Sequence, residues 1–449
     1  MNRHAQSFWI LAVILITGWA SCIVIEHPFN GLPPGPWRGV LELEPRSLAT
    51  NPEGKPLPQL LNLEFEEVTQ GELPFNFEVK YTDEQNFYIE IINGTERIRV
   101  DQIQTGVNRA TAKDSIRIDF PLYESYIIAL FEEDVIEGQW VVTTRDNYRV
   151  PFVAWYGRDY RFTNLRKAPV ADLSGRWEAT FDLESKSPFK GIGEFEQDGN
   201  HLTGTFLTET GDYRFLEGTV QADKLYLSAF DGAHAFLFEG KVLEDGSLIG
   251  TFRSGTHYQT TWEGRRNPDF ELAHPDSLTF LTDPAQPLSF QFPNQDGELV
   301  AFDGPKLAGK VRIVQIMGTW CPNCRDETDF LREYLAENPN PDLAVVGLAF
   351  EKHRDREQSL AIIHRYHERL ELPYDLLWAG YYQKEEAAKA LPMLNQILSY
   401  PTMIFVDRSG RVRRIHTGFS GPATSKYEAF KADFEEYVQQ LLFEKTTTF

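Results

Sequence analysis

A pair of cysteines between a buried strand and a helix limits most strongly what this chain can fold into. The apolar run Val311–Met317 predicts a short buried strand, and a helical pattern follows from Cys324 to about Ala336. Cys321 therefore lies at the helix N-terminus, where unpaired backbone N–H groups and the helix dipole favour a thiolate. Because a thiolate is the species that attacks a disulfide, we expect Cys321 to be a nucleophile. Cys324, one turn inside the helix, is expected to resolve the mixed disulfide.

The Cys-x-x-Cys spacing by itself also forms half of many zinc sites. The chain has only three cysteines, so no second pair completes such a site. His353, His364 and His367 occur on or before a different predicted helix and do not supply the missing ligands. We therefore expect a redox disulfide between Cys321 and Cys324, with no metal and no cofactor.

From about 287 to 443 the sequence alternates between strands and helices, which predicts an α/β domain whose sheet is built from crossover units. A linker over 268–286 precedes it. Besides the two elements at the cysteine pair, the predicted elements are strands over 343–350, 374–378, 402–406 and 412–415, and helices over 357–370, 385–398 and 427–442.

Alternating apolar and polar residues before this domain predict two all-β modules, over 37–168 and 173–267. Each opens with a strand that carries a tryptophan, and later strands also correspond, so we interpret the second module as a duplicate of the first. Regular short strands separated by turn dipeptides such as Asp198-Gly199 favour a barrel or a sandwich, without choosing between them.

The interior of the β modules allows two interpretations. Inward aromatic side chains fill a core, which is the interpretation we favour, or they line a lipocalin-like pocket. His234 and His257 are interpreted as surface or core residues rather than metal ligands.

Residues 1–22 have the pattern of an export signal, in which an early positive charge precedes an apolar run and small residues lead to Cys22. Trp19-Ala-Ser-Cys resembles the lipobox of bacterial lipoproteins, whose cysteine is lipidated, although Trp19 stands where leucine is usual. The alternative is an uncleaved anchor, because apolar residues continue to Ile25.

Charge places the rest of the chain and excludes one class of partner. A linker over 23–36 follows the export signal, and no Lys or Arg occurs between Arg3 and Arg38, so either tether leaves the bulk of the chain on the extracytoplasmic (periplasmic) side of a membrane. The formal net charge of −22 offers no basic stripe for phosphates, so we expect no nucleic-acid partner.

Over about 287–442 the sequence resembles the TlpA/ResA-like extracytoplasmic thiol–disulfide oxidoreductases of the thioredoxin superfamily. The resemblance rests on Gly318-Thr-Trp-Cys-Pro-Asn-Cys-Arg-Asp-Glu327, on the extra helix and strand between Phe350 and Tyr381, and on Tyr400-Pro401-Thr402. It implies that Pro401 follows a cis bond, packs against the cysteine pair and offers backbone groups to an incoming chain. It also implies substrate-positioning roles for Trp320, Tyr400 and Thr402.

The chain departs from the thioredoxin pattern at two places. Gln315 stands where thioredoxins proper hold a buried aspartate, and an amide cannot exchange a proton. Glu327 aligns instead with a glutamate that assists proton transfer in ResA-like proteins, the alternative being an exposed helix carboxylate. The order Pro322-Asn323 differs from the more common one, so the family's reduction potentials do not transfer to this chain.

The resemblance implies a membrane-tethered oxidoreductase that takes electrons from a membrane thiol donor and reduces oxidised protein thiols. Cytochrome c maturation and repair of extracytoplasmic disulfides are the roles it implies. One alternative is a thiol peroxidase of the peroxiredoxin type, but the threonine needed three residues before the cysteine is replaced by Gly318, with Thr319 one residue out of place. Another is a ligand- or partner-binding lipoprotein with an accessory redox domain.

Overall fold

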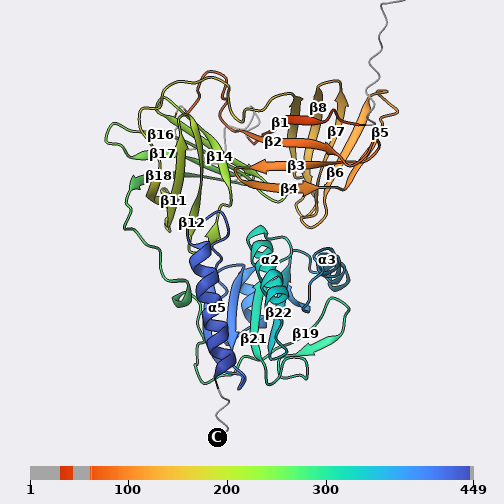
Figure 1. Cartoon of the computed structure of the whole chain (residues 1–449), viewed down its shortest axis with the longest axis vertical. Coiled ribbons are helices and arrows are strands. Elements are labelled where there is room, and N and C mark those ends of the chain that lie inside the picture. Colours follow the sequence, from red (N-terminus) through yellow and green to blue (C-terminus); the bar gives the residue numbers. More distant parts are fainter. Residues whose placement is uncertain (1–30, 44–60, 62, 445–449) are drawn as a thin grey trace, which may run out of the picture.

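The structure is a computed structural model that describes residues 31–43, 61 and 63–444. Two all-β modules lie side by side, and a C-terminal α/β domain packs against both (Figure 1). The predicted fold class, two all-β modules followed by an α/β domain, is confirmed. The predicted export signal or anchor, with Cys22, lies outside the described residues. Among the helices that the structure describes, none is both long enough and apolar enough to span a bilayer.

The first module is a single antiparallel sheet of nine strands, ordered β4-β3-β2-β1-β9-β8-β7-β6-β5. Buried and partly exposed residues alternate along strands such as β6, because successive side chains of a strand point to opposite faces. The sheet is curved, but its end strands β4 and β5 do not pair with each other. It therefore remains open as a half-barrel. Its strands are β1 (Gly35–Glu42), β2 (Glu72–Tyr81), β3 (Phe87–Asn93), β4 (Glu96–Val100), β5 (Ile103–Val107), β6 (Asp114–Phe120), β7 (Ser125–Glu132), β8 (Val135–Val142) and β9 (Arg149–Tyr156).

The second module closes into a barrel, because β11 pairs with β12 as well as with β10. Aromatic side chains fill its interior: Phe206 stacks on Phe238 with ring centroids 4.6 Å apart, and Trp262 is completely buried beside them. Aromatic residues thus form a core, as favoured from the sequence. The strands are β10 (Gly175–Phe181), β11 (Phe189–Asp198), β12 (His201–Thr208), β13 (Gly211–Asp212), β14 (Leu216–Gln221), β15 (Lys224–Phe230), β16 (Ala235–Val242), β17 (Leu248–Ser254) and β18 (Tyr258–Arg266).

The two modules have a similar strand order, but only the second closes into a barrel. In each, the first strand pairs with both the second and the last strand of the module. The second module closes its ring, whereas the open side of the first is covered by the second module itself. Tyr226, Phe230 and Leu237 point outward from β15 and β16 and are fully buried in the core of the first module. Alternate residues of the same strands, such as Leu227 and Phe238, fill the barrel.

The α/β domain has a five-stranded sheet in the order β23-β22-β21-β24-β25. The first three of these strands run parallel, and β24 and β25 are antiparallel to their neighbours. A short hairpin and a 3₁₀ turn precede the central strand. The elements are η1 (Pro275–Ser277), β19 (Gln291–Pro293), β20 (Leu299–Ala301), β21 (Val311–Met317), α2 (Pro322–Glu337), β22 (Leu343–Glu351), α3 (Arg356–Arg369), β23 (Leu376–Tyr381), α4 (Lys384–Ala390), β24 (Thr402–Val406), β25 (Val412–Thr417) and α5 (Tyr427–Phe443).

Two predicted elements of this domain differ from the structure. The helix predicted over 385–398 ends at Ala390, because Pro392 cannot donate a helical hydrogen bond and its ring disfavours a helical residue before it. The strand predicted over 374–378 begins two residues later and extends to Tyr381. Its partner strand β22 is bulged at Ala349 and Phe350, a feature that residue pattern does not reveal.

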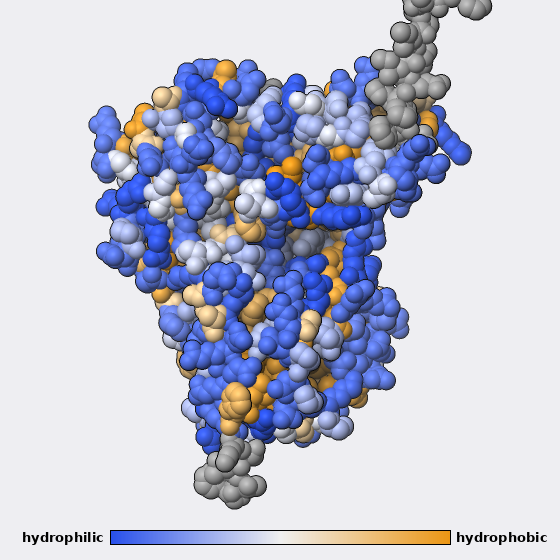
Figure 2. Space-filling view, viewed as in Figure 1, coloured by the Kyte–Doolittle hydropathy of each residue, from blue (hydrophilic) through white to orange (hydrophobic). Residues whose placement is uncertain are grey.

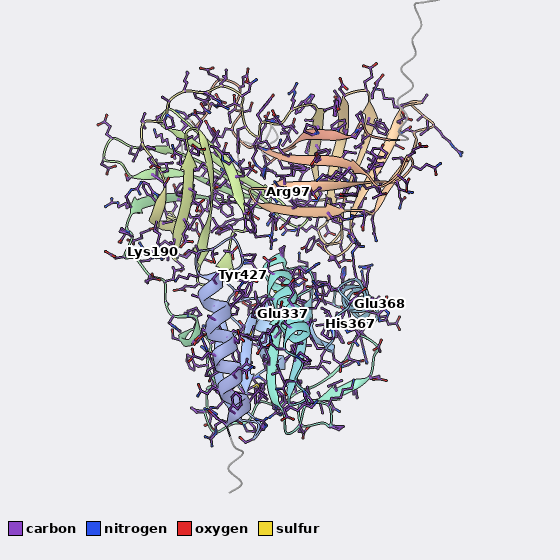
Figure 3. All side chains as sticks on the ribbon, viewed as in Figure 1. Arg97, Lys190, Glu337, His367, Glu368 and Tyr427 are labelled. Carbon is purple, nitrogen blue, oxygen red and sulfur yellow. The ribbon has the colours of Figure 1, made fainter. Side chains whose placement is uncertain are left out.

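Both β modules contact the α/β domain through polar side chains. From the first module, Glu124 pairs with His353 at 2.9 Å. From the barrel, Glu194 accepts a hydrogen bond from the backbone N–H of Ser425, just before α5 begins at Tyr427 beside the barrel (Figure 3). The outer face seen in Figure 2 is mainly hydrophilic, in keeping with the high net charge.

The shared core makes the two β modules one folding unit. A substitution that removes one large side chain from this core tests the inference. Phe230→Ala removes a ring that belongs to the second module but contacts Phe75, Phe120 and Trp140 of the first. We expect the free energy of unfolding of the full chain to fall by about 3–5 kcal/mol. Guanidinium denaturation followed by tryptophan fluorescence measures it. The control Leu243→Ala removes a side chain of the same module that is 37% exposed; a loss at Phe230 as small as that of this control would contradict a shared core.

Candidate functional site

Cys321 is the N-cap residue of α2 and points its sulfur at the first turn of the helix. The backbone N–H of Cys324 donates to the Cys321 sulfur over 3.3 Å, and the Cys321 thiol donates to the carbonyl of Tyr400 over 3.5 Å. An N-cap acceptor of this kind satisfies one of the unpaired N–H groups of the helix and is favoured when it carries negative charge. The geometry therefore suits a thiolate at Cys321, which is 7% exposed.

Cys324 lies one turn further along α2 and is completely buried. Both cysteines are free thiols in this structure. Burial, reinforced by the neighbouring Cys321, raises the pKa of the Cys324 thiol well above its usual range. The two cysteines of one motif thus differ in accessibility, and burial keeps Cys324 as a thiol, which suits the roles of nucleophile and resolving cysteine.

Glu327 is fully buried on the inner face of α2. Neither of its carboxylate oxygens has a hydrogen-bond partner among the described residues. Burial raises the pKa of Glu327 to about 8, and the nearby Gln315 amide opposes this only in part. The carboxyl group is therefore largely protonated at neutral pH, and the interpretation of Glu327 as an exposed helix carboxylate is wrong.

Gln315 is buried on β21 and holds the inner face of α2. Its amide donates to the hydroxyl of Thr328 over 3.1 Å and to the carbonyl of Cys324 over 3.4 Å. The hydroxyl of Tyr374 donates to the Gln315 carbonyl oxygen over 3.4 Å. An amide at this position fixes the orientation of the helix, and Glu327 is the carboxyl group that the sequence identified on this inner face.

Trp320 packs across the mouth of the site. Its indole N–H donates to the carbonyl of Phe350 over 2.9 Å, and its ring meets those of Tyr382 and Tyr400 edge-on. A Cβ added at Gly318 would lie only 2.3 Å from the indole nitrogen, so glycine at this position allows the ring to lie flat against the chain.

The Tyr400–Pro401 peptide bond is cis and lies against the cysteine pair. The carbonyl of Pro401 accepts the backbone N–H of Gly418 over 2.9 Å, while that of Tyr400 receives the Cys321 thiol. The hydroxyl of the buried Thr402 donates to the carbonyl of Ser399 over 2.9 Å and so closes this turn. The structure thus places Tyr400, Pro401 and Thr402 together beside Cys321.

Sequence reasoning missed three charged residues near the pair. Glu351, at the end of β22, is buried, and burial raises its pKa to about 7 although Thr319 donates to it from both its backbone N–H and its hydroxyl. Lys352 follows it and lies over the Trp320 ring at 4.9 Å; burial and the charge of Arg145 lower its pKa to about 8. Asp326 lies on α2, and burial raises its pKa to about 7. For Glu351 the sequence did contain a signal, because a carboxylate at the end of an apolar strand lies close to a buried core.

A segment of the barrel, 209–214, covers one side of the motif. The side chain of Asn323 donates to the carbonyl of Asp212 over 3.1 Å, and the hydroxyl of Ser399 donates to the carbonyl of Thr210 over 2.6 Å. Arg214 donates to the carbonyl of Pro322 over 3.4 Å and also binds Asp326. Nothing in the sequence pattern of the barrel indicated this contact, because it depends on how the modules dock.

Within the described ranges, no group of three or more His, Cys, Asp or Glu side chains is placed to hold a metal ion. His234 is partly buried and stacks on Phe236, and His257 is exposed beside Tyr148. His353 pairs with Glu124 of the first module.

The model of the AhpC/TSA family matches residues 282–415. No curated protein is significantly similar to the chain. Solved structures similar to its C-terminal part include a thiol:disulfide interchange protein of the thioredoxin family from Chlorobium tepidum TLS, with 24% identity over 35% of this chain and 98% of that one and a TM-score of 0.27. Others are a DsbF homologue from Corynebacterium diphtheriae, with 18% identity over 38% and 99% and a TM-score of 0.29, and a secreted thiol-disulfide isomerase from Corynebacterium glutamicum, with 20% identity over 39% and 98% and a TM-score of 0.29.

At these identities and TM-scores the solved structures carry no argument about activity. The family model and the strand order of the sheet agree on the same part of the chain. The C-terminal domain therefore has a thioredoxin-like α/β fold, and its residues 282–415 match the AhpC/TSA family model.

Proposed function

We propose that this chain is a membrane-tethered thiol–disulfide oxidoreductase that reduces disulfides of extracytoplasmic proteins through Cys321 and Cys324. The observation that carries the proposal is the asymmetry of the pair. Cys321 accepts a helix N–H at the N-cap of α2, and Cys324 is fully buried behind it. A nucleophile that keeps a small accessible surface, with a second thiol held out of reach of solvent, suits stepwise disulfide exchange.

The reaction has two exchange steps. The Cys321 thiolate attacks one sulfur of the substrate disulfide, so that bond breaks, a mixed disulfide forms and the first substrate thiolate leaves. Cys324 then loses its proton and attacks the Cys321 sulfur, which releases the second substrate thiolate and forms the Cys321–Cys324 disulfide. The substrate gains two electrons and the protein loses two, which a membrane thiol donor restores in the proposed cycle.

Glu327 in its ionised form is the proposed proton acceptor for Cys324. Its raised pKa, about 8, keeps it close to the range in which it can both take and return a proton at neutral pH. Trp320, Tyr400, Pro401 and Thr402 are the proposed positioning residues. The Tyr400 carbonyl accepts the Cys321 thiol, the Trp320 ring packs on Tyr400, and Pro401 and Thr402 continue the same turn.

Two contacts at the motif argue against the peroxidase alternative. The hydroxyl of Thr319 is already donated to Glu351 over 2.8 Å, away from a peroxide at Cys321. At Gly318, where the peroxidase pattern needs threonine, an added side chain would collide with Trp320.

Trapping the mixed disulfide tests the exchange steps. In Cys324→Ser the first step proceeds and the second cannot, so we expect a covalent complex with substrate protein that withstands denaturation and is released by reductant. Non-reducing electrophoresis of cells that express the variant measures it. The matched variant Cys321→Ser should trap no partner, and equal trapping by both variants would contradict the assignment of the nucleophile.

The pH dependence tests Glu327. Its folded pKa, about 8, exceeds the ordinary value of 4.5, so the folded protein retains a proton that the unfolded chain releases between these values. Glu327 should therefore lower the stability of the reduced protein as pH rises through this window, by at most ~1.4 kcal/mol per pH unit, in addition to the falls from Glu351 and Asp326, whose pKa values are also raised. Glu327→Gln, which cannot ionise, should flatten this fall in denaturant titrations from pH 4.5 to 8.

The same variant tests the proton transfer itself. We expect release of the mixed disulfide in Glu327→Gln to slow on the order of 10²-fold near pH 7, measured by quenched-flow thiol labelling. Glu333→Gln, on the exposed face of the same helix, is the control. A release rate equal to that of the control would contradict proton transfer by Glu327 and limit this residue to a structural role.

Cys22 is the proposed lipidation site, and its substitution tests the tether. If the lipobox is used, Cys22→Ala should lose incorporation of labelled fatty acid and shift the protein out of the membrane fraction. If the apolar segment is an uncleaved anchor, the variant should stay with the membrane as the wild type does. Fractionation with labelled palmitate therefore decides between the two tethers.

A further inference from the structure

All three modules meet around a cavity of about 490 Å³ whose inner wall includes Trp320, the residue before Cys321. The first module supplies Trp140 and Arg145, the barrel supplies His234, and the α/β domain supplies Lys352. Cavities of this size hold small ligands or a few residues of a chain. The cavity forms where the β modules dock on the α/β domain, so its lining depends on residues from all three modules.

The charge of this cavity is opposite to that of the protein. Arg145 and Lys352 line it, and no carboxylate side chain does, in a chain whose net charge is −22. Arg145 lies over the Tyr148 ring at 5.3 Å and Lys352 over the Trp320 ring at 4.9 Å, and neither forms an ion pair with a carboxylate in the described part of the chain. Two cations held against aromatic faces are positioned without being neutralised.

Three carboxyl groups close to lining residues are paired with other side chains. Glu124 pairs with His353 over 2.9 Å, and Asp231 contacts His234 over 3.4 Å. Glu351 accepts two hydrogen bonds from Thr319. These pairings leave the two cations of the cavity available to a ligand.

An unpartnered donor points to the same conclusion. Trp140 is 2% exposed and lines the cavity, yet its indole N–H has no hydrogen-bond partner among the described residues. The hydroxyl of Thr144, also on the wall, is likewise without a partner there. A buried N–H left unpaired costs free energy of about 1–3 kcal/mol, which a bound acceptor oxygen would recover.

The approach to Cys321 from another side is blocked. The barrel segment 209–214 is hydrogen bonded to Asn323 and to Ser399, on the side of the motif that carries the Tyr400–Pro401 turn. This contact leaves open a route to the Cys321 sulfur past Trp320 and the ring of Tyr400 that it meets, along the wall of the cavity. Residues next to the disulfide of a substrate on this route would then lie against Arg145 and Lys352.

We propose that this three-module cavity binds carboxylate groups flanking the disulfide that Cys321 attacks, with Arg145, Lys352 and the indole N–H of Trp140 as the ligand-binding groups. This proposal rests on the proposed function, since it names the substrate class of the same redox pair. The carboxylates belong to an acidic segment of a protein or to a small dicarboxylate disulfide, which share this chemistry.

Single-turnover reduction by the full chain tests the proposal. The reduced protein is mixed with disulfide peptides that carry Asp or, as neutral isosteres, Asn on either side of each cysteine, and with dithiodipropionate or its diamide. We expect the rate constant for the acidic member of at least one pair to exceed that of its neutral partner by about tenfold, which corresponds to ~1.4 kcal/mol. A preference confined to dithiodipropionate supports a small disulfide, and one confined to the peptides supports a protein segment.

The double variant Arg145→Gln/Lys352→Met should reduce this acidic-to-neutral ratio to near one. The control Arg109→Gln removes a positive charge from an exposed turn of the first module and should keep the ratio. A wild type that reduces acidic and neutral members equally, or a ratio that persists in the double variant, overturns the cavity assignment while the oxidoreductase function stands.

A binding measurement separates the two proposals. In Cys321→Ser/Cys324→Ser no exchange occurs, and calorimetry should still show about tenfold tighter binding of the acidic peptide, lost in the quadruple variant that also carries the two cavity substitutions. Charge-selective binding without any reduction by the wild type would overturn the proposed function and keep the site. Equal binding of both peptides would overturn the site.

Discussion

The arrangement of the whole molecule depends on one buried guanidinium. Arg214, in the barrel segment after β13, is ion-paired with Glu96 of the first module, Asp231 of the barrel and Asp326 of α2. Burial alone would lower its pKa, but the three carboxylates together hold the pKa well above the usual range, so the group stays charged. Because removing one partner of a buried ion pair typically costs ~3–5 kcal/mol, this junction fixes the three modules to one another. Asp326 lies two residues after Cys324, so the same junction orients the first turn of α2.

The consequence is that the β modules contact the candidate site directly. The barrel segment 209–214 contacts Asn323 of the motif, and the first module reaches the α/β domain through Glu124 and Asp101. The first module does not complete its own core, because Tyr226 and Phe230 of the barrel fill the open side of the half-barrel. In this architecture the β modules partly cover the motif that contains Cys321.

Local patterns in the sequence carried most of the fold. Alternation located the strands, and the step from a buried strand to a helix placed Cys321 at an N-cap. The closure of one β module and the opening of the other could not be predicted, because the pairing of β11 with β12 depends on the curvature of the whole sheet. A signal did exist for the shared core: β15 and β16 are apolar at consecutive positions, which indicates strands buried on both faces, as these are. Glu327 and Trp320, close in sequence to the motif, were identified for the same reason, whereas Asp326 was missed because its partner Arg214 comes from the barrel, and Arg145, Glu351 and Lys352 meet the motif only through tertiary packing.

Burial also bears on the proposed proton transfer in a motif without the buried aspartate of thioredoxins. A thiol and a carboxyl that share a water-free interior both become weaker acids, since each loses solvation of its charged form. At Cys324 the pKa rises well above its usual range, and at Glu327 it rises to about 8. Transfer from the thiol to a carboxylate of ordinary pKa would be opposed by ~1.4 kcal/mol for every additional pKa unit that separates them. Placing both groups on the inner face of α2, with Gln315 holding that face in position, narrows this separation without an aspartate on β21.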